Sequence, residues 1–140
     1  MATNQQRAIG EPGRVLIVDD DDMIREALQT ALEDAGLTVR TADHGRAALD
    51  TLDAWSPDLI LLDLMMPVMD GWTFREAQRA RPAAAHIPVI VLSAARNLAE
   101  VAESLRPAQV IRKPFDLEEV IAAVFRALHG PTEATAGGTV

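Results

Sequence analysis

Three short runs of consecutive apolar residues limit what this chain can fold into. They cover residues 15–18, 59–62 and 89–92 and consist entirely of Val, Leu and Ile. A strand with one face toward water alternates apolar and polar residues, and none of these runs alternates. They therefore predict strands that are buried on both faces, as in a parallel sheet that helices cover on both sides.

The segments between these runs change to the period of a helix. Apolar residues at 24, 27, 28, 31 and 32 form one stripe, and another extends from position 117 to 128. Weaker patterns predict helices near 46–55, 72–81 and 96–105, and two further strands over 37–41 and 109–112. Five strands that alternate with five helices predict an α/β fold with a doubly wound, five-stranded parallel sheet.

Polar residues follow four of the predicted strands at their carboxyl ends. They are Asp19 and Asp20 after the first strand, Asp63 after the third, Ser93 after the fourth and Lys113 after the fifth. The carboxyl ends of parallel strands meet at one edge of the sheet, where ligands bind in folds of this kind. The sequence therefore predicts one site that contains three carboxylates, a hydroxyl and an ammonium group.

Three neighbouring carboxylates repel one another and call for a cation. An all-oxygen, partly open site suits Mg²⁺, which keeps some of its water molecules and accepts phosphate oxygens. We expect Asp20 to bind the metal most directly, Asp19 to act through a water molecule, and Asp63 to add a carboxylate oxygen. The backbone carbonyl of Met65 is a further candidate ligand, whereas its sulfur is too soft for Mg²⁺.

Asp63 is the candidate for covalent chemistry. A carboxylate can attack phosphorus and form an aspartyl phosphate. The charge on the transferring group can then be stabilised by the metal, by Lys113 and by Ser93. Asp63 fits the nucleophile best because it ends what should be a central strand.

Four segments carry a resemblance to a known family. In chain order they are VLIVDDDDMIREAL, PDLILLDLMMPVMDGW, IPVIVLSA and IRKPF. With their connecting elements they span residues 14–128, and they resemble the receiver domain of two-component response regulators. The resemblance implies a flavodoxin-like (βα)5 fold with strand order 2-1-3-4-5, and a cis peptide bond between Lys113 and Pro114.

The same resemblance implies a function. Asp63 would receive a phosphoryl group from a sensor histidine kinase or a histidine phosphotransfer protein, in a reaction that depends on Mg²⁺. Ser93 and Lys113 would couple this event to the face around the fourth helix, the fifth strand and the fifth helix, which a downstream target protein reads. Such a domain is not an enzyme in the ordinary sense, because it catalyses only its own phosphorylation and dephosphorylation.

Two features depart from the family pattern. The position three residues before Lys113 often carries Tyr or Phe in the family, and here it is Val110. The segment between Ser93 and Lys113 is short and contains Pro107. Both features bear on the output face, so they affect the expected signalling step and leave the acceptor chemistry unchanged.

Length, charge and composition indicate the class of protein. The 140 residues suit a flexible N-terminal arm at 1–13, one receiver domain at 14–129 and a flexible C-terminal tail at 130–140, without an output domain. The net charge of −8 argues against non-specific nucleic-acid binding. The chain has no Cys, no signal-peptide pattern and no apolar run near the ~20 residues that span a bilayer, so we expect a stand-alone cytoplasmic protein without membrane insertion.

Two other functions remain open on the sequence. Haloacid-dehalogenase phosphatases also use a nucleophilic Asp and Mg²⁺, but they need a second Asp two residues later, where this chain has Met65. A phosphorylation-independent binding module on the same fold is supported by Val110. Asp21 and Asp22 have a structural interpretation, because acidic residues in the first turn cap a helix and interact favourably with its dipole.

Overall fold

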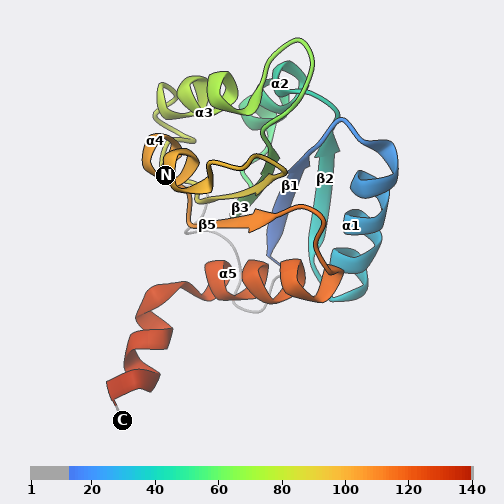
Figure 1. Ribbon diagram of the computed structural model, residues 1–140. Helices are drawn as coiled ribbons and strands as arrows, with labels where there is room; N and C mark the ends of the chain where they lie inside the picture. The colour runs from blue at the N-terminus through green and yellow to red at the C-terminus, as the bar shows by residue number, and fades with distance from the viewer. Residues whose placement is uncertain (1–12, 140) are drawn as a thin grey trace.

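Five strands alternate with five helices in a computed structural model that describes residues 13–139, with side chains up to residue 129 (Figure 1). The observed alternation is the one that the sequence predicts, with small shifts at the element ends. The elements are β1 (Arg14–Val18), α1 (Asp22–Asp34), β2 (Thr38–Ala42), α2 (Gly45–Ala54), β3 (Leu59–Asp63), α3 (Gly71–Arg79), β4 (Val89–Ser93), α4 (Leu98–Leu105), β5 (Gln109–Arg112) and α5 (Leu117–Thr139).

All five strands pair in parallel and form one sheet in the order β2-β1-β3-β4-β5. The central strand is β3, in which Ile60 pairs with Leu16 of β1 on one side and with Val89 of β4 on the other. This topology confirms the predicted flavodoxin-like, doubly wound fold. The direction of winding reverses between β1 and β3, so a ligand site is expected beyond the carboxyl ends of these two strands.

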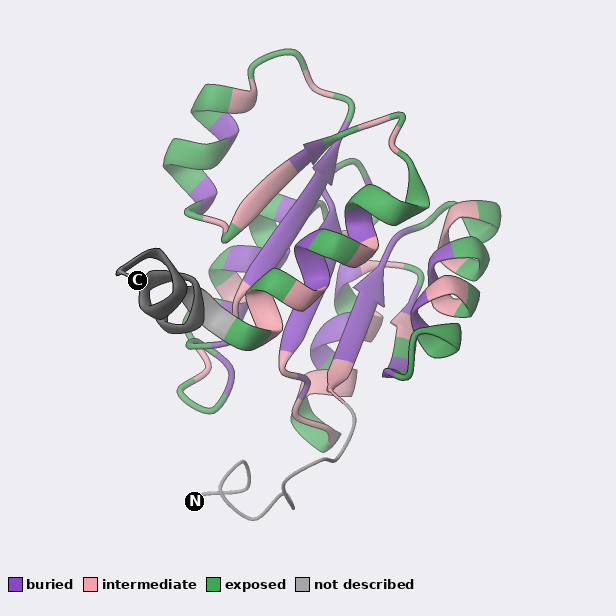
Figure 2. Cartoon of the chain, turned by 90° about the horizontal axis from the view of Figure 1, so that it is seen from below, coloured by how far each residue is buried: buried purple, intermediate pink, exposed green. Residues whose placement is uncertain are grey.

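Helices cover both faces of the sheet (Figure 1). On one face Leu28 of α1 and Val124 of α5 belong to a buried cluster with Leu61. On the other face Phe74 of α3 belongs to a second buried cluster with Leu62, to which α2 and α4 also contribute. Figure 2 shows the central strands β1, β3 and β4 buried, the edge strands β2 and β5 partly buried, and exposed residues on the outer sides of the helices. The continuous apolar runs exist because successive strand residues enter opposite clusters.

Helix α1 begins where the sequence places its capping residues. The Asp21 carboxylate accepts hydrogen bonds from the backbone N–H groups of Met23 at 2.9 Å and Ile24 at 3.1 Å. Asp22 lies in the first turn of the helix. These contacts confirm the structural interpretation of Asp21 and Asp22, and they separate this pair from the strand-end pair Asp19 and Asp20.

The ends of the chain bear on the predicted domain limits. Of the N-terminal arm expected at 1–13, residues 1–12 lie outside the described residues. Helix α5 continues to Thr139, past residue 129 at which the sequence places the end of the domain. The apolar stripe stops earlier because the residues after 129 are small and polar, and flexibility of residues 130–140 stays a prediction. Within the described residues, no helix combines the length and the apolar character that a membrane span requires.

Candidate functional site

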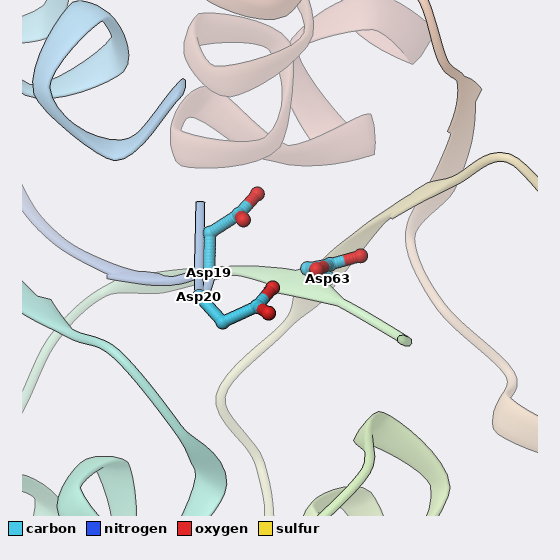
Figure 3. Close-up of side chains that lie close together, drawn as sticks. All are labelled: Asp19, Asp20 and Asp63. Carbon is cyan, nitrogen blue, oxygen red and sulfur yellow. The ribbon is translucent and has the colours of Figure 1, made fainter. Parts of the chain in front are cut away.

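Three carboxylates meet at the carboxyl ends of β1 and β3 (Figure 3). One oxygen atom from each of Asp19, Asp20 and Asp63 lies within 4.8 Å of the other two. Val18 pairs with Leu62 in the sheet, so the acidic residues that follow them emerge side by side. Asp19 and Asp63 are buried and Asp20 is exposed. A cluster of hard oxygen ligands with one side open to water fits a divalent cation that keeps part of its hydration shell.

The Lys113 side chain reaches two of these carboxylates from β5. Its Nζ lies 3.3 Å from Oδ2 of Asp19 and 3.3 Å from Oδ1 of Asp63. The backbone N–H of Lys113 donates to the Ser93 carbonyl at 2.9 Å, and the peptide bond to Pro114 is cis, as the family resemblance implies. The ends of β1, β3 and β5 therefore contribute charged groups to one site.

The electrostatic balance at Asp63 disfavours its ionised form. Burial raises the pKa of Asp63 from 3.8 to about 6, and the negative charge of Asp19 adds to the rise. The Lys113 ammonium and the Met65 backbone N–H, which donates to Oδ1 of Asp63 at 3.3 Å, lower the pKa of Asp63 without offsetting the burial. One lysine thus leaves the cluster short of positive charge, and a bound cation would supply it.

Ser93 is fully buried at the end of β4, the strand next to β3. Leu92 pairs with Asp63, so Ser93 lies one step beyond Asp63 along the neighbouring strand. Its Oγ accepts a hydrogen bond from the backbone N–H of Ala95 at 3.0 Å. The hydroxyl proton is left for another acceptor, and the predicted bond to a phosphoryl oxygen stays a prediction.

Met65 lies in the loop that leaves β3, and its side chain is 64% exposed. Its backbone N–H donates to Oδ1 of Asp63 and links this loop to the end of β3. The expectation that the thioether takes no part in metal binding stays a prediction. The role of the Met65 carbonyl as a ligand stays a prediction.

Sequence reasoning missed Arg25, which holds the first strand end in place. Its Nη1 donates to the backbone carbonyl of Asp19 at 2.8 Å. The carboxylate of Asp19 accepts a further hydrogen bond from the N–H of Asp21 at 2.9 Å. A basic residue in the first turns of a helix is usually a surface residue, so the sequence offered no signal for this contact.

Gly71 begins α3 directly against the backbone at the end of β3. Its N–H donates to the Leu64 carbonyl at 2.9 Å. A Cβ atom at position 71 would lie 2.8 Å from Cα of Leu64 and 3.0 Å from the carbonyl oxygen of Asp63. Backbone atoms cannot move aside as a side-chain end can, so this approach requires glycine and sets the path of the chain after Asp63.

Gly71→Ala is therefore expected to lower the free energy of unfolding by about 1–3 kcal/mol, because the added methyl group overpacks the backbone. Gly45→Ala is the matched control. Gly45 also begins a helix, but a Cβ atom there would meet the flexible side chain of Met69. Urea denaturation of both variants measures the difference, and equal losses would contradict the proposed role of Gly71.

The fold and the site together define a class of protein. A doubly wound, five-stranded domain with an acidic cluster and a lysine at its carboxyl edge has the architecture of a signalling receiver. Residues 15–125 match the family described as "Response regulator receiver domain". The chain belongs to this family, whose members act in two-component signal transduction.

Individual relatives agree with this assignment. "Response regulator MprA" of Mycolicibacterium vanbaalenii is 35% identical over 129 residues, which are 91% of this chain and 55% of that protein. "Regulatory protein AtoC" of Escherichia coli is 38% identical over 117 residues, which are 82% of this chain and 25% of that protein. The chain thus spans about half of the first relative and a quarter of the second.

Solved structures share the fold over most of the described chain. The chemotaxis response regulator CheY4 of Vibrio cholerae has a TM-score of 0.78 and 30% identity, covering 83% of this chain and 98% of that one. The receiver domain of a signal transduction histidine kinase from Syntrophus aciditrophicus has a TM-score of 0.76 and 33% identity. The match covers 84% of this chain and 91% of that one.

Proposed function

We propose that this domain is a phosphoryl-accepting switch in which Asp63 receives the phosphoryl group. The observation that carries the proposal is the position of Asp63 at the end of the central strand, buried, beside two carboxylates and 3.3 Å from the Lys113 ammonium. Among the described residues, the Met65 N–H and Lys113 both meet Oδ1 of Asp63. Its Oδ2 is therefore left for attack on phosphorus.

The reaction is a displacement at phosphorus. An oxygen of Asp63 forms the new P–O bond while the bond from phosphorus to the donor breaks, and the donor leaves with the electron pair. In the cell the donor is a phosphohistidine of a histidine kinase or a phosphotransfer protein. Lys113 stays beside Oδ1, the other oxygen of Asp63, and offsets the charge of the transferring group. Ser93 donates its hydroxyl proton to a phosphoryl oxygen.

The donor set of the acidic cluster fits Mg²⁺. Asp20 and Asp63 would hold the ion, with Asp19 acting through water and the Met65 carbonyl as a further ligand. When bound, Mg²⁺ neutralises charge on the phosphoryl oxygens. Asp20 is the exposed member, so it would hold the ion on the side of the cluster that is open to water.

The output of the switch is proposed to be a protein contact on the α4-β5-α5 face. Val110 is half-buried and packs against the cluster under α4, where the family often places an aromatic ring. We expect a change at the site to reach this face through the position of α4. We place the domain in the cytoplasm, with a kinase or phosphotransfer protein upstream and a target protein downstream. It transfers a phosphoryl group to itself and loses it again, without turning over another substrate.

Acetyl phosphate tests the proposal without a partner protein, because cleavage of its P–O bond transfers the phosphoryl group and releases acetate. Incubation with acetyl phosphate and Mg²⁺ is expected to give one phosphoryl adduct by intact-protein mass spectrometry, and EDTA is expected to prevent it. A protein that stays unmodified with Mg²⁺ would contradict the acceptor function. An adduct that forms equally well in EDTA would contradict the metal requirement.

A further inference from the structure

Arg75 of α3 is a buried cation outside the acidic site, with 8% of its surface exposed. Its Nε donates to the Leu105 carbonyl at 3.0 Å, its Nη2 to the Arg106 carbonyl at 3.1 Å and its Nη1 to Oε1 of Gln78 at 2.9 Å. These three partners are neutral oxygens. Burial, together with the charge of Arg79, lowers the pKa of Arg75 to about 10, so the group is still charged at neutral pH.

The carbonyls that Arg75 meets form the carboxyl end of α4. The last carbonyls of a helix lack partners within the helix and carry the negative end of its dipole, so a cation there is favourable. Arg79 also donates to the Leu105 carbonyl. Arg106 ends the helix with a φ of 51°, in the left-handed region that closes helix ends. Two arginines of α3 therefore converge on one helix end.

Gln78 makes this arrangement rigid. The residue is fully buried, and its Nε2 donates to the carbonyls of Ala84 at 2.9 Å and Ile87 at 3.0 Å. Its Oε1 is thereby directed at Arg75. The guanidinium of Arg75 is bound by Gln78 on one side and by the carbonyls at the end of α4 on the other, so its side chain has little rotamer freedom.

The amino end of α4 has no comparable anchor among the described residues. Asn97 precedes the helix without a side-chain capping bond, and its Nδ2 donates instead to Oε1 of Glu100 at 2.8 Å. The buried residues of α4 are Val101 and Leu105, in its middle and at its end. The loop before the helix is linked to Ser93 through the Ala95 N–H.

We infer that Arg75 and Arg79 clamp the carboxyl end of α4, so that the helix pivots at Leu105 and its amino end moves when Ser93 engages the phosphoryl group. The clamp follows from the contacts of α3 with α4. The direction of the movement rests on the proposed acceptor function, because it requires a phosphorylated Asp63. The two parts are tested separately.

Amide hydrogen exchange in the unmodified protein tests the clamp. In Arg75→Met, exchange of amides 102–106 is expected to be about tenfold faster or more, because the freed carbonyls lose hydrogen bonds from a charged donor. Amides of α1 should be unchanged. Arg79→Met, which removes an exposed partner of the Leu105 carbonyl, should give a smaller increase in the same segment, and it decides the question if Arg75→Met does not fold. Arg81→Met is the matched control, since its bond is to Asp53.

Phosphorylation with acetyl phosphate and Mg²⁺ tests the pivot. In the wild type, changes in amide exchange should concentrate at residues 94–101 and spare residues 104–106. In phosphorylated Arg79→Met they should extend to residues 104–106. Unchanged exchange at 102–106 in the unmodified variants would overturn the clamp, and changes centred on 104–106 in the phosphorylated wild type would overturn the pivot. Failure of the wild type to accept a phosphoryl group would count against the acceptor function, and the exchange data on unmodified protein would still decide the clamp.

Discussion

Replacing Asp63 with Asn is expected to abolish the Mg²⁺-dependent phosphoryl adduct and, in metal-free buffer at pH 7, to raise the free energy of unfolding by about 3 kcal/mol. The adduct is lost because an amide is a poor nucleophile toward phosphorus. The stability rises because burial beside Asp19 lifts the pKa of Asp63 from 3.8 to about 6, so the ionised form is costly in the folded state. Asn keeps the volume and removes that charge.

The sign of the pH dependence follows from the direction of this shift. The folded-state pKa of Asp63 lies above the unfolded value, so the folded protein binds more protons than the unfolded chain between about pH 4 and pH 6. The stability contributed by Asp63 is complete below about pH 4 and is lost as the pH rises through about 6. The gain in the free energy of unfolding from Asp63→Asn should therefore vanish below about pH 4 and reach its full size near pH 7.

Urea denaturation in EDTA at several pH values measures this difference. Asp50→Asn is the matched control, because Asp50 is exposed and faces Arg46 at 3.8 Å in a surface pair. Its effect should stay within about 0.5 kcal/mol. Mg²⁺ should stabilise the wild type by mass action and narrow the gap between wild type and Asp63→Asn. If Asp63→Asn were less stable than the wild type in EDTA at pH 7, the argument from charge repulsion and burial would be wrong.

The acidic site could be predicted because its parts follow from strand ends. The unbroken apolar run before Asp63 indicated a strand buried on both faces, and parallel pairing then placed Asp19, Asp20 and Lys113 at the same edge. The structure brings these four side chains together. The order of the strands did not follow from periodicity, because five similar units can be wound in several orders. It came from the resemblance to receiver domains.

The contacts of Arg75 could not be predicted from the sequence. Its partners are the backbone carbonyls at positions 105 and 106, some 30 residues later, and every residue type offers the same carbonyl. Hydrophobic periodicity reports which face of a helix is buried, and on α3 it gives no reason to bury an arginine. Gly71 is similar in this respect, because its close approach to Leu64 is a feature of packing that no sequence pattern reports.

Replacing Lys113 with Met is expected to change stability in the opposite direction from Asp63→Asn. Lys113 is the cation that contacts the two buried carboxylates, at 3.3 Å from each. Its removal should lower the free energy of unfolding in EDTA at pH 7 by about 3 kcal/mol, because buried charges lose their partner. It should also slow phosphorylation by acetyl phosphate about 100-fold, because the transferring group loses a fixed positive charge. Arg112→Met removes the neighbouring exposed cation and is the control for both measurements.

The double variant Lys113→Met with Asp63→Asn separates charge from packing. If Lys113 acts through its charge, its loss should cost much less once Asp63 is neutral, and the two stability changes should fail to add by about 1 kcal/mol or more. Strict additivity would mean that the lysine stabilises the fold independently of Asp63, through its pair with Asp19 or through its aliphatic chain. The free energy of unfolding that Lys113→Met still removes in the Asp63→Asn background reports the pair of Lys113 with Asp19, whose carboxylate is completely buried. A residual cost near zero would mean that Lys113 stabilises the fold only through its ion pair with Asp63, and that its pair with Asp19 contributes nothing measurable.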